Sequence, residues 1–147
     1  MAQVLVGLLL GLAWWRLAPR PEAYWIGTTW YAPDDAGFGA AQDVQFAALT
    51  LVPGVAVGVC LAAWSGRPRP LVRLGLALMG ACLGSGAVWL VGAGLSGGLG
   101  GAPETTGVAV TAPVTLSSPG VVLLWPVLAT LVPALILSIR ALFTDRP

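Results

Sequence analysis

The hydrophobic residues of this chain gather into long runs separated by short polar stretches. Three runs, residues 46–64, 74–95 and 121–139, contain no charged side chain. A helix that crosses the hydrocarbon core of a bilayer needs about 20 apolar residues, and an Arg or Asp at its centre costs about 2.5–3.5 kcal/mol. The pattern therefore predicts three membrane-spanning helices.

The apolar stretch at the N-terminus is shorter. The 15 residues before Arg16 would form about 22 Å of helix, less than the roughly 30 Å of hydrocarbon core. If Arg16 extends its charged end outward to water, a first span over residues 2–18 is expected. A signal peptide is the weaker interpretation, because no basic residue precedes the run and Trp14-Trp15-Arg16 stands where cleavage needs small residues. A true start upstream of Met1 is the third alternative.

The stretch between the first two predicted spans is expected to be an outer loop. Pro19 and Pro21 end the first helix, because proline lacks a backbone donor. Pro33-Asp34-Asp35 is typical of a helix start, where carboxylates stabilise the free amides, and this helix would run on into the second span. The loop also carries aromatic residues that favour the membrane–water boundary: Tyr24, Trp25, Trp30 and Tyr31.

The turn between the second and third spans carries Arg67, Arg69 and Arg73. Because the turn is short, we expect these spans to be antiparallel neighbours. Basic residues in short loops remain in the cytoplasm, so this turn and both chain termini are predicted to be cytoplasmic in a plasma membrane. Segment 97–118 then faces outside, and its Val and Thr residues predict an irregular or partly extended outer loop.

Composition agrees with a single integral membrane domain over residues 1–147. Apolar residues make up 57% of the chain and charged residues 9%, and the mean hydropathy is +0.87. Soluble domains have about a quarter of their residues charged, so lipid must solvate much of this surface. The predicted fold is all-α, a four-helix transmembrane bundle with a short first span. A net charge of +1 gives no electrostatic basis for nucleic-acid binding.

Side chains that commonly carry chemistry are scarce. The chain has no His, which removes the commonest metal ligand and the usual proton carrier near neutral pH. Cys60 and Cys82 show no metal or redox spacing, and we expect small buried packing residues and no disulfide. The predicted spans contain no acid or base of the kind that a proton-coupled transporter needs. We therefore expect no enzyme activity, no cofactor and no metal site.

Three predicted spans carry glycines four residues apart, which share a helix face and let two backbones approach closely in lipid. Packing within one bundle is favoured over dedicated self-association, and both stay open. The pairs are Gly7/Gly11, Gly54/Gly58 and Gly80/Gly84.

Two residues are candidates for contacts on the outer face. Asp43 is the acid nearest the mouth of a span, and we expect it in the first turn of the second span, stabilised by the helix dipole and water. The alternative is a carboxylate that binds an ion or a partner. Trp30, in the aromatic loop, is the second candidate.

The chain resembles a group of small four-span membrane proteins of unknown function from actinobacteria. The resemblance implies a plasma-membrane location and carries over no catalytic residue. It rests on Trp14-Trp15 with Ala18-Pro19, Asp43-x-x-Phe46, Gly54-xxx-Gly58 before Trp64, the Arg67/Arg69 turn, Gly84-Ser85 with Trp89 and Gly92, and Trp125-Pro126.

These features favour a non-enzymatic accessory or assembly protein of the cell envelope. Its expected partners are membrane lipid and other membrane proteins or further copies of itself. The alternative is a small oligomeric channel or transporter, with spans kinked at Pro53, Pro126 and Pro133. Its polar pathway would lie near Thr50, Ser85 and Thr130. An enzyme that uses Asp43 or Asp34/Asp35 has the least support.

Overall fold

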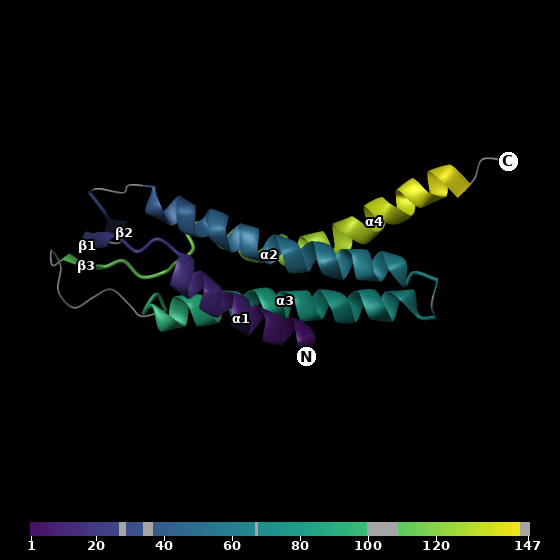
Figure 1. The fold of residues 1–147 in the computed structure, drawn as a ribbon, viewed down its shortest axis with the longest axis horizontal. Helices are drawn as coiled ribbons and strands as arrows, with labels where there is room; N and C mark the ends of the chain where they lie inside the picture. Colours follow the sequence, from purple (N-terminus) through teal and green to yellow (C-terminus); the bar gives the residue numbers. More distant parts are fainter. Residues whose placement is uncertain (27–28, 34–36, 67, 100–108, 145–147) are drawn as a thin grey trace.

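A computed structural model describes the chain except for residues 27–28, 34–36, 67, 100–108 and 145–147. Within the described residues the chain is mostly helical, and the helices lie along one long axis with a small sheet at one end (Figure 1). The helices are α1 (Ala2–Leu17), α2 (Phe38–Ala63), α3 (Pro70–Leu95), the 3-10 helix η1 (Pro119–Leu123) and α4 (Leu124–Thr144). The strands are β1 (Glu22–Ile26), β2 (Thr29–Tyr31) and β3 (Ala109–Thr111).

Three helical segments are long and apolar enough to cross a membrane. They are α2, α3 and the η1–α4 segment, and α1 is a shorter apolar helix. Only 22–28% of each apolar window is buried inside the protein. α2, α3 and α4 all extend beyond the spans predicted from the sequence. The extension is longest at the start of α2, because a helix can continue past its apolar run when polar side chains find partners there.

The helices associate in two parallel pairs, α1 with α3 and α2 with α4, and these pairs make most of the helix contacts. α2 and α3 run antiparallel on either side of the short turn (Figure 1). They share few contacts, so the close helix packing of this chain lies in the other two pairs. A short turn fixes the direction of two helices, whereas side-chain size decides which helices pack closely.

The three strands form an antiparallel sheet in the order β2-β1-β3. Trp25 on β1 pairs with Trp30 on β2, and Ala23 on β1 pairs with Val110 on β3. The hairpin of β1 and β2 was missed, because its residues were assigned to a loop. An extended outer segment was expected near β3. The structure shows that this strand pairs with β1, although the two strands lie far apart in the sequence.

The main core lies near the sheet. Trp14, Phe46, Val88, Val114 and Trp125 are all fully buried there, and the rings of Trp14 and Phe46 meet edge to face with centroids 5.0 Å apart. We call this region the sheet end. We call the opposite region, which holds the turn between α2 and α3, the arginine end.

Candidate functional site

Asp43 joins two distant parts of the chain at the sheet end. It lies in the second turn of α2 and is only 8% exposed. The backbone amides of Ser117 and Ser118 donate to Oδ1 and Oδ2 respectively, both at 2.9 Å. Because each carboxylate oxygen accepts a charge-assisted hydrogen bond, Asp43 holds the segment before η1 against α2.

The neighbouring Gln42 is fully buried and uses both ends of its amide. Its Nε2 donates to the carbonyl oxygens of Pro19, at 2.8 Å, and Pro113, at 3.3 Å. Its Oε1 accepts the amide of Thr115 at 3.0 Å. The backbone carbonyl of Gln42 also accepts the indole N–H of Trp14 at 3.1 Å. We call the side chains of Gln42 and Asp43, with these partners, the polar junction.

Asp43 lies deeper in α2 than the sequence predicted. It is not in the first turn of α2, which begins at Phe38, and both of its carboxylate oxygens accept hydrogen bonds from backbone amides. It is also largely enclosed, so an outer-face contact through its carboxylate lacks exposed surface. The expected helix start at Pro33 is displaced, since α2 begins at Phe38 and no side chain of the described residues caps it. Asp34 and Asp35 lie outside the described residues.

Trp30, the other candidate for an outer-face contact, is partly buried on the sheet. Its ring lies edge to face against Trp25, with centroids 5.1 Å apart. It packs against a small cluster of buried residues at the sheet. These are Ala23, Ala32, Phe38 and Ala112.

Glycines let α1 and α3 approach closely. A Cβ built on Gly7 would collide with the carbonyl oxygen of Gly84, and one built on Gly92 would collide with the ring of Trp14. A Cβ at Gly80 would lie 2.5 Å from Oε1 of Gln3. The contacts advance together along both helices, as parallel packing of small faces requires. The structure thus places Gly80 and Gly84 inside the molecule, facing α1.

The second glycine face joins α2 to α4. A Cβ on Gly54 would lie 3.0 Å from Cβ of Leu128, and one on Gly58 would lie 2.6 Å from Cβ of Val132. Gly54 and Gly58 therefore also face a helix of the same chain. Gly84 connects the two pairs, since its added Cβ would lie 2.8 Å from the ring of Trp125 at the start of α4.

The hydroxyl groups suggested for a polar pathway all bond to backbone carbonyls. Thr50 donates to Phe46 in the preceding turn of α2, and Thr130 donates to Val127 in α4. Ser85 of α3 donates to the carbonyl of Val122 in η1, which is a bond between elements. In this conformation the three hydroxyls serve helix geometry and packing.

The two cysteines lie on the outside of the bundle. Cys60 and Cys82 are both free thiols and both exposed. The expectation that they are buried was wrong, because a small weakly polar side chain can also face lipid tails. Within the described part of the chain, no group of three or more Cys, Asp or Glu residues is placed to hold a metal ion.

Pro126 also differs from its predicted position. It lies in the first turn of α4, where a missing backbone donor is tolerated, whereas Pro53 and Pro133 lie inside helices. The arginines predicted to set the topology lie at the arginine end. Arg69 immediately precedes α3 and Arg73 lies in its first turn, while Arg67 is outside the described residues.

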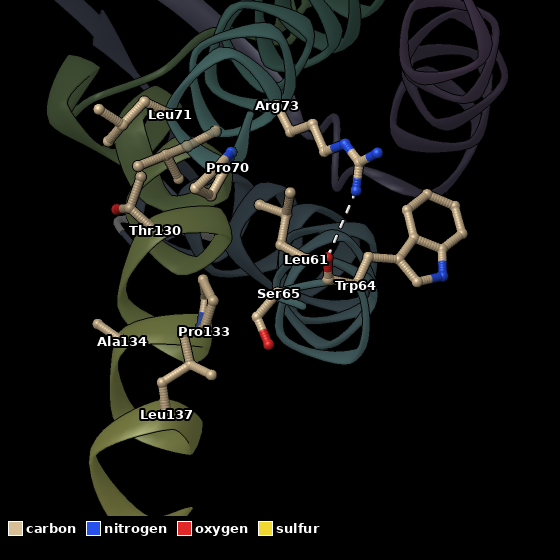
Figure 2. Close-up of a pocket in the computed structure, with 11 residues that line it drawn as sticks. Leu61, Trp64, Ser65, Pro70, Leu71, Arg73, Thr130, Pro133, Ala134 and Leu137 are labelled. Atoms are coloured by element: carbon tan, nitrogen blue, oxygen red, sulfur yellow. Dashed lines mark hydrogen bonds between the residues drawn. The ribbon is translucent and has the colours of Figure 1, made fainter. Parts of the chain in front are cut away.

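An apolar cleft of about 220 Å³ opens beside Arg73 at the arginine end (Figure 2). The end of α2 forms one wall and α4 forms the facing wall, and Pro70 and Leu71 of α3 close one side. Nη1 of Arg73 donates to the carbonyl of Trp64 at 3.4 Å, which holds the guanidinium beside the cleft. We call this space the α4 cleft.

Comparisons of the chain with protein-family models, with curated proteins and with solved structures found no match. The resemblance to actinobacterial four-span proteins therefore stays a prediction.

Sequence reasoning missed the role of Gln42, whose side chain bonds to the backbone of Pro19, Pro113 and Thr115. The available signal was the polar group Gln42-Asp43-x-Gln45 at the entrance of an otherwise apolar helix. Gln45 behaves similarly, since its Nε2 donates to the carbonyl of Leu17 at 3.1 Å. Polar residues in such a position have to find partners when tertiary contacts bury them.

Proposed function

We propose that the chain is an integral protein of the plasma membrane, in which α1 to α4 form a four-helix bundle and the sheet faces outside. The observation that carries the proposal is the exposure of the apolar helices. Three of them are long enough to span, yet at most 28% of each apolar window is covered by protein. Water would solvate this surface poorly, so lipid is the solvent that supports the fold.

We propose, further, that the protein acts as a non-enzymatic accessory or assembly partner in the cell envelope. The sheet end supports this role because its small sheet carries the paired indole rings of Trp25 and Trp30. The hydrogen bonds of the polar junction fix the neighbouring segments to α2. Tyr31 and Ile26 are exposed there. Tyrosine and tryptophan are the residues that most often anchor protein contacts.

Membrane location is tested by fractionating cells that express the full chain and washing the membranes with alkaline carbonate. The chain is expected to stay in the pellet and to enter solution only with detergent. Release by carbonate alone would overturn the membrane proposal. Reporter fusions after Thr144 and within segment 97–118 test the orientation, with the first expected inside and the second outside.

The accessory role is tested by mild-detergent extraction followed by affinity capture and identification of co-purifying membrane proteins. A charge reversal on the sheet, Glu22→Arg, is expected to weaken capture, because Glu22 is exposed on β1. A matched reversal at the other end, Arg69→Glu, is expected to leave capture unchanged. A chain that purifies alone under all mild conditions would contradict the accessory role.

A further inference from the structure

The arginine end combines two features that the accessory role does not use. The first is the α4 cleft, whose lining is apolar apart from Ser65, Arg73 and Thr130. The second is positive charge. Arg69 and Arg73 flank the start of α3, and no acidic residue of the described chain lies at this end, since Glu22 and Asp43 are both at the sheet end.

We propose that the α4 cleft binds an anionic phospholipid, whose phosphate lies at Arg73 and Arg69 and whose acyl chain lies between α2 and α4. The inference rests on the proposed membrane location. An apolar cleft beside basic side chains suits an anionic lipid, because basic pockets between membrane helices bind anionic headgroups.

The geometry of Arg73 supports a phosphate contact. A guanidinium has five N–H donors, and within the described residues Arg73 uses one of them, toward the carbonyl of Trp64. That bond orients the planar group beside the cleft and leaves donors for phosphate oxygens, which arginine binds in a bidentate manner. The first amides of α3 also have no side-chain cap among the described residues, so the helix dipole adds positive potential.

The apolar part of the cleft suits an acyl chain. Leu61 of α2 lies across from Pro133 and Leu137 of α4, and Ser65 and Arg73 also line the cleft (Figure 2). Two further cavities, of about 290 and 250 Å³, lie on other sides of the same helix end, and both are also lined by Leu61 and Trp64. The end of α2 is thus surrounded by space that protein does not fill. Arg73 can thus meet a phosphate while Leu61, Pro133 and Leu137 contact an acyl chain.

The test is native mass spectrometry of the full chain in mild detergent, with phosphatidylglycerol and phosphatidylcholine of identical acyl chains. The wild type is expected to retain phosphatidylglycerol preferentially. In the double variant Arg69→Gln/Arg73→Gln this preference is expected to fall by about fivefold for each arginine removed, the factor that one basic residue contributes near anionic lipid.

The matched control is Arg16→Gln/Arg20→Gln, which removes the same charge at the sheet end, where both guanidinium groups stack on Trp15. It is expected to keep the preference of the wild type. Equal loss in both double variants would show attraction by net charge alone and would overturn the proposal. Equal retention of the two lipids by the wild type would overturn it as well.

A second pair of variants tests the cleft itself and remains informative if the arginine variants fold poorly. Ala134→Phe fills the cleft and is expected to lower phosphatidylglycerol retention severalfold, whereas Leu135→Phe, on the outer side of α4, is not. Displacement of the lipid by inorganic phosphate would show that the headgroup alone is bound and would overturn the acyl-chain assignment. A dimer without lipid preference would show that a second copy fills the cleft, which also contradicts the proposal. Carbonate extraction separates these outcomes from a failure of the membrane location.

Discussion

The sheet end and the arginine end differ in how protein fills the space between helices. At the sheet end, α1, α2, α3 and the segment before η1 enclose the rings of Trp14, Phe46 and Trp125, and the polar junction ties loops to α2. At the arginine end, α4 leads away from α2 and α3 in Figure 1, and open clefts surround Leu61 and Trp64.

The helix pairs of this chain are therefore stabilised mainly by contacts at the sheet end. Glycine faces bring the helix backbones together, and the polar junction then supplies fixed hydrogen bonds to the segments that connect them. At the arginine end Ala62 is one of the few buried side chains among the described residues. The positions of the helices there depend more on the molecules that occupy the clefts, which we propose to be lipid. Three sets of substitutions test whether the two ends differ in this way.

Removing a core ring is expected to have the largest effect. Phe46→Ala leaves a cavity beside Trp14 and should lower the free energy of unfolding by about 3–5 kcal/mol. Leu137→Ala, at the side of the α4 cleft, should lower it by less than about 1 kcal/mol, because Leu137 is 40% exposed. Reversible denaturation in mixed detergent micelles measures both values. Similar losses at both positions would mean that the two ends are equally packed.

The second largest loss of stability is expected when a larger residue replaces Gly84, which contacts both helix pairs. Gly84→Leu would force apart Gln3, Gly7 and Trp125, and should destabilise the protein by about 3 kcal/mol. Gly86→Leu is the matched control on the same helix, since a Cβ there meets nothing within 4 Å. Thermal unfolding in detergent is the readout. Leucine favours a helix more than glycine does, so a Gly86→Leu variant as unstable as Gly84→Leu would contradict the packing argument.

Opening the polar junction should have a smaller effect. Asp43→Ala leaves the amides of Ser117 and Ser118 without their acceptors, at a cost of about 1–3 kcal/mol in total once local rearrangement admits water. Gln45→Ala removes one exposed hydrogen bond and should cost about 0.5 kcal/mol. Hydrogen exchange of segment 113–118 reports the loss locally. Unchanged exchange in Asp43→Ala would contradict the role of the junction.

The sequence predicted the features that follow from local composition. Charge-free runs identified three long apolar helices, and Gly54/Gly58 and Gly80/Gly84 were noticed because spacing alone places each pair on one face. The choice of helix partner could not be predicted, since it depends on how Gly7 and Gly84 fit together in space. Gln42 was missed for a similar reason, because its partners lie 23 to 73 positions away along the chain.

Coverage of the apolar helices by lipid is tested most sharply with the native thiol of Cys82. This thiol is exposed on the surface of α3, so the account expects lipid to shield it from water. In the Cys60→Ala variant in native membranes, Cys82 is expected to react with an aqueous maleimide only after solubilisation in denaturing detergent. Thr111→Cys on exposed β3, made in a variant without native cysteines, is the positive control and should react at once. Rapid labelling of Cys82 in intact membranes would contradict the account.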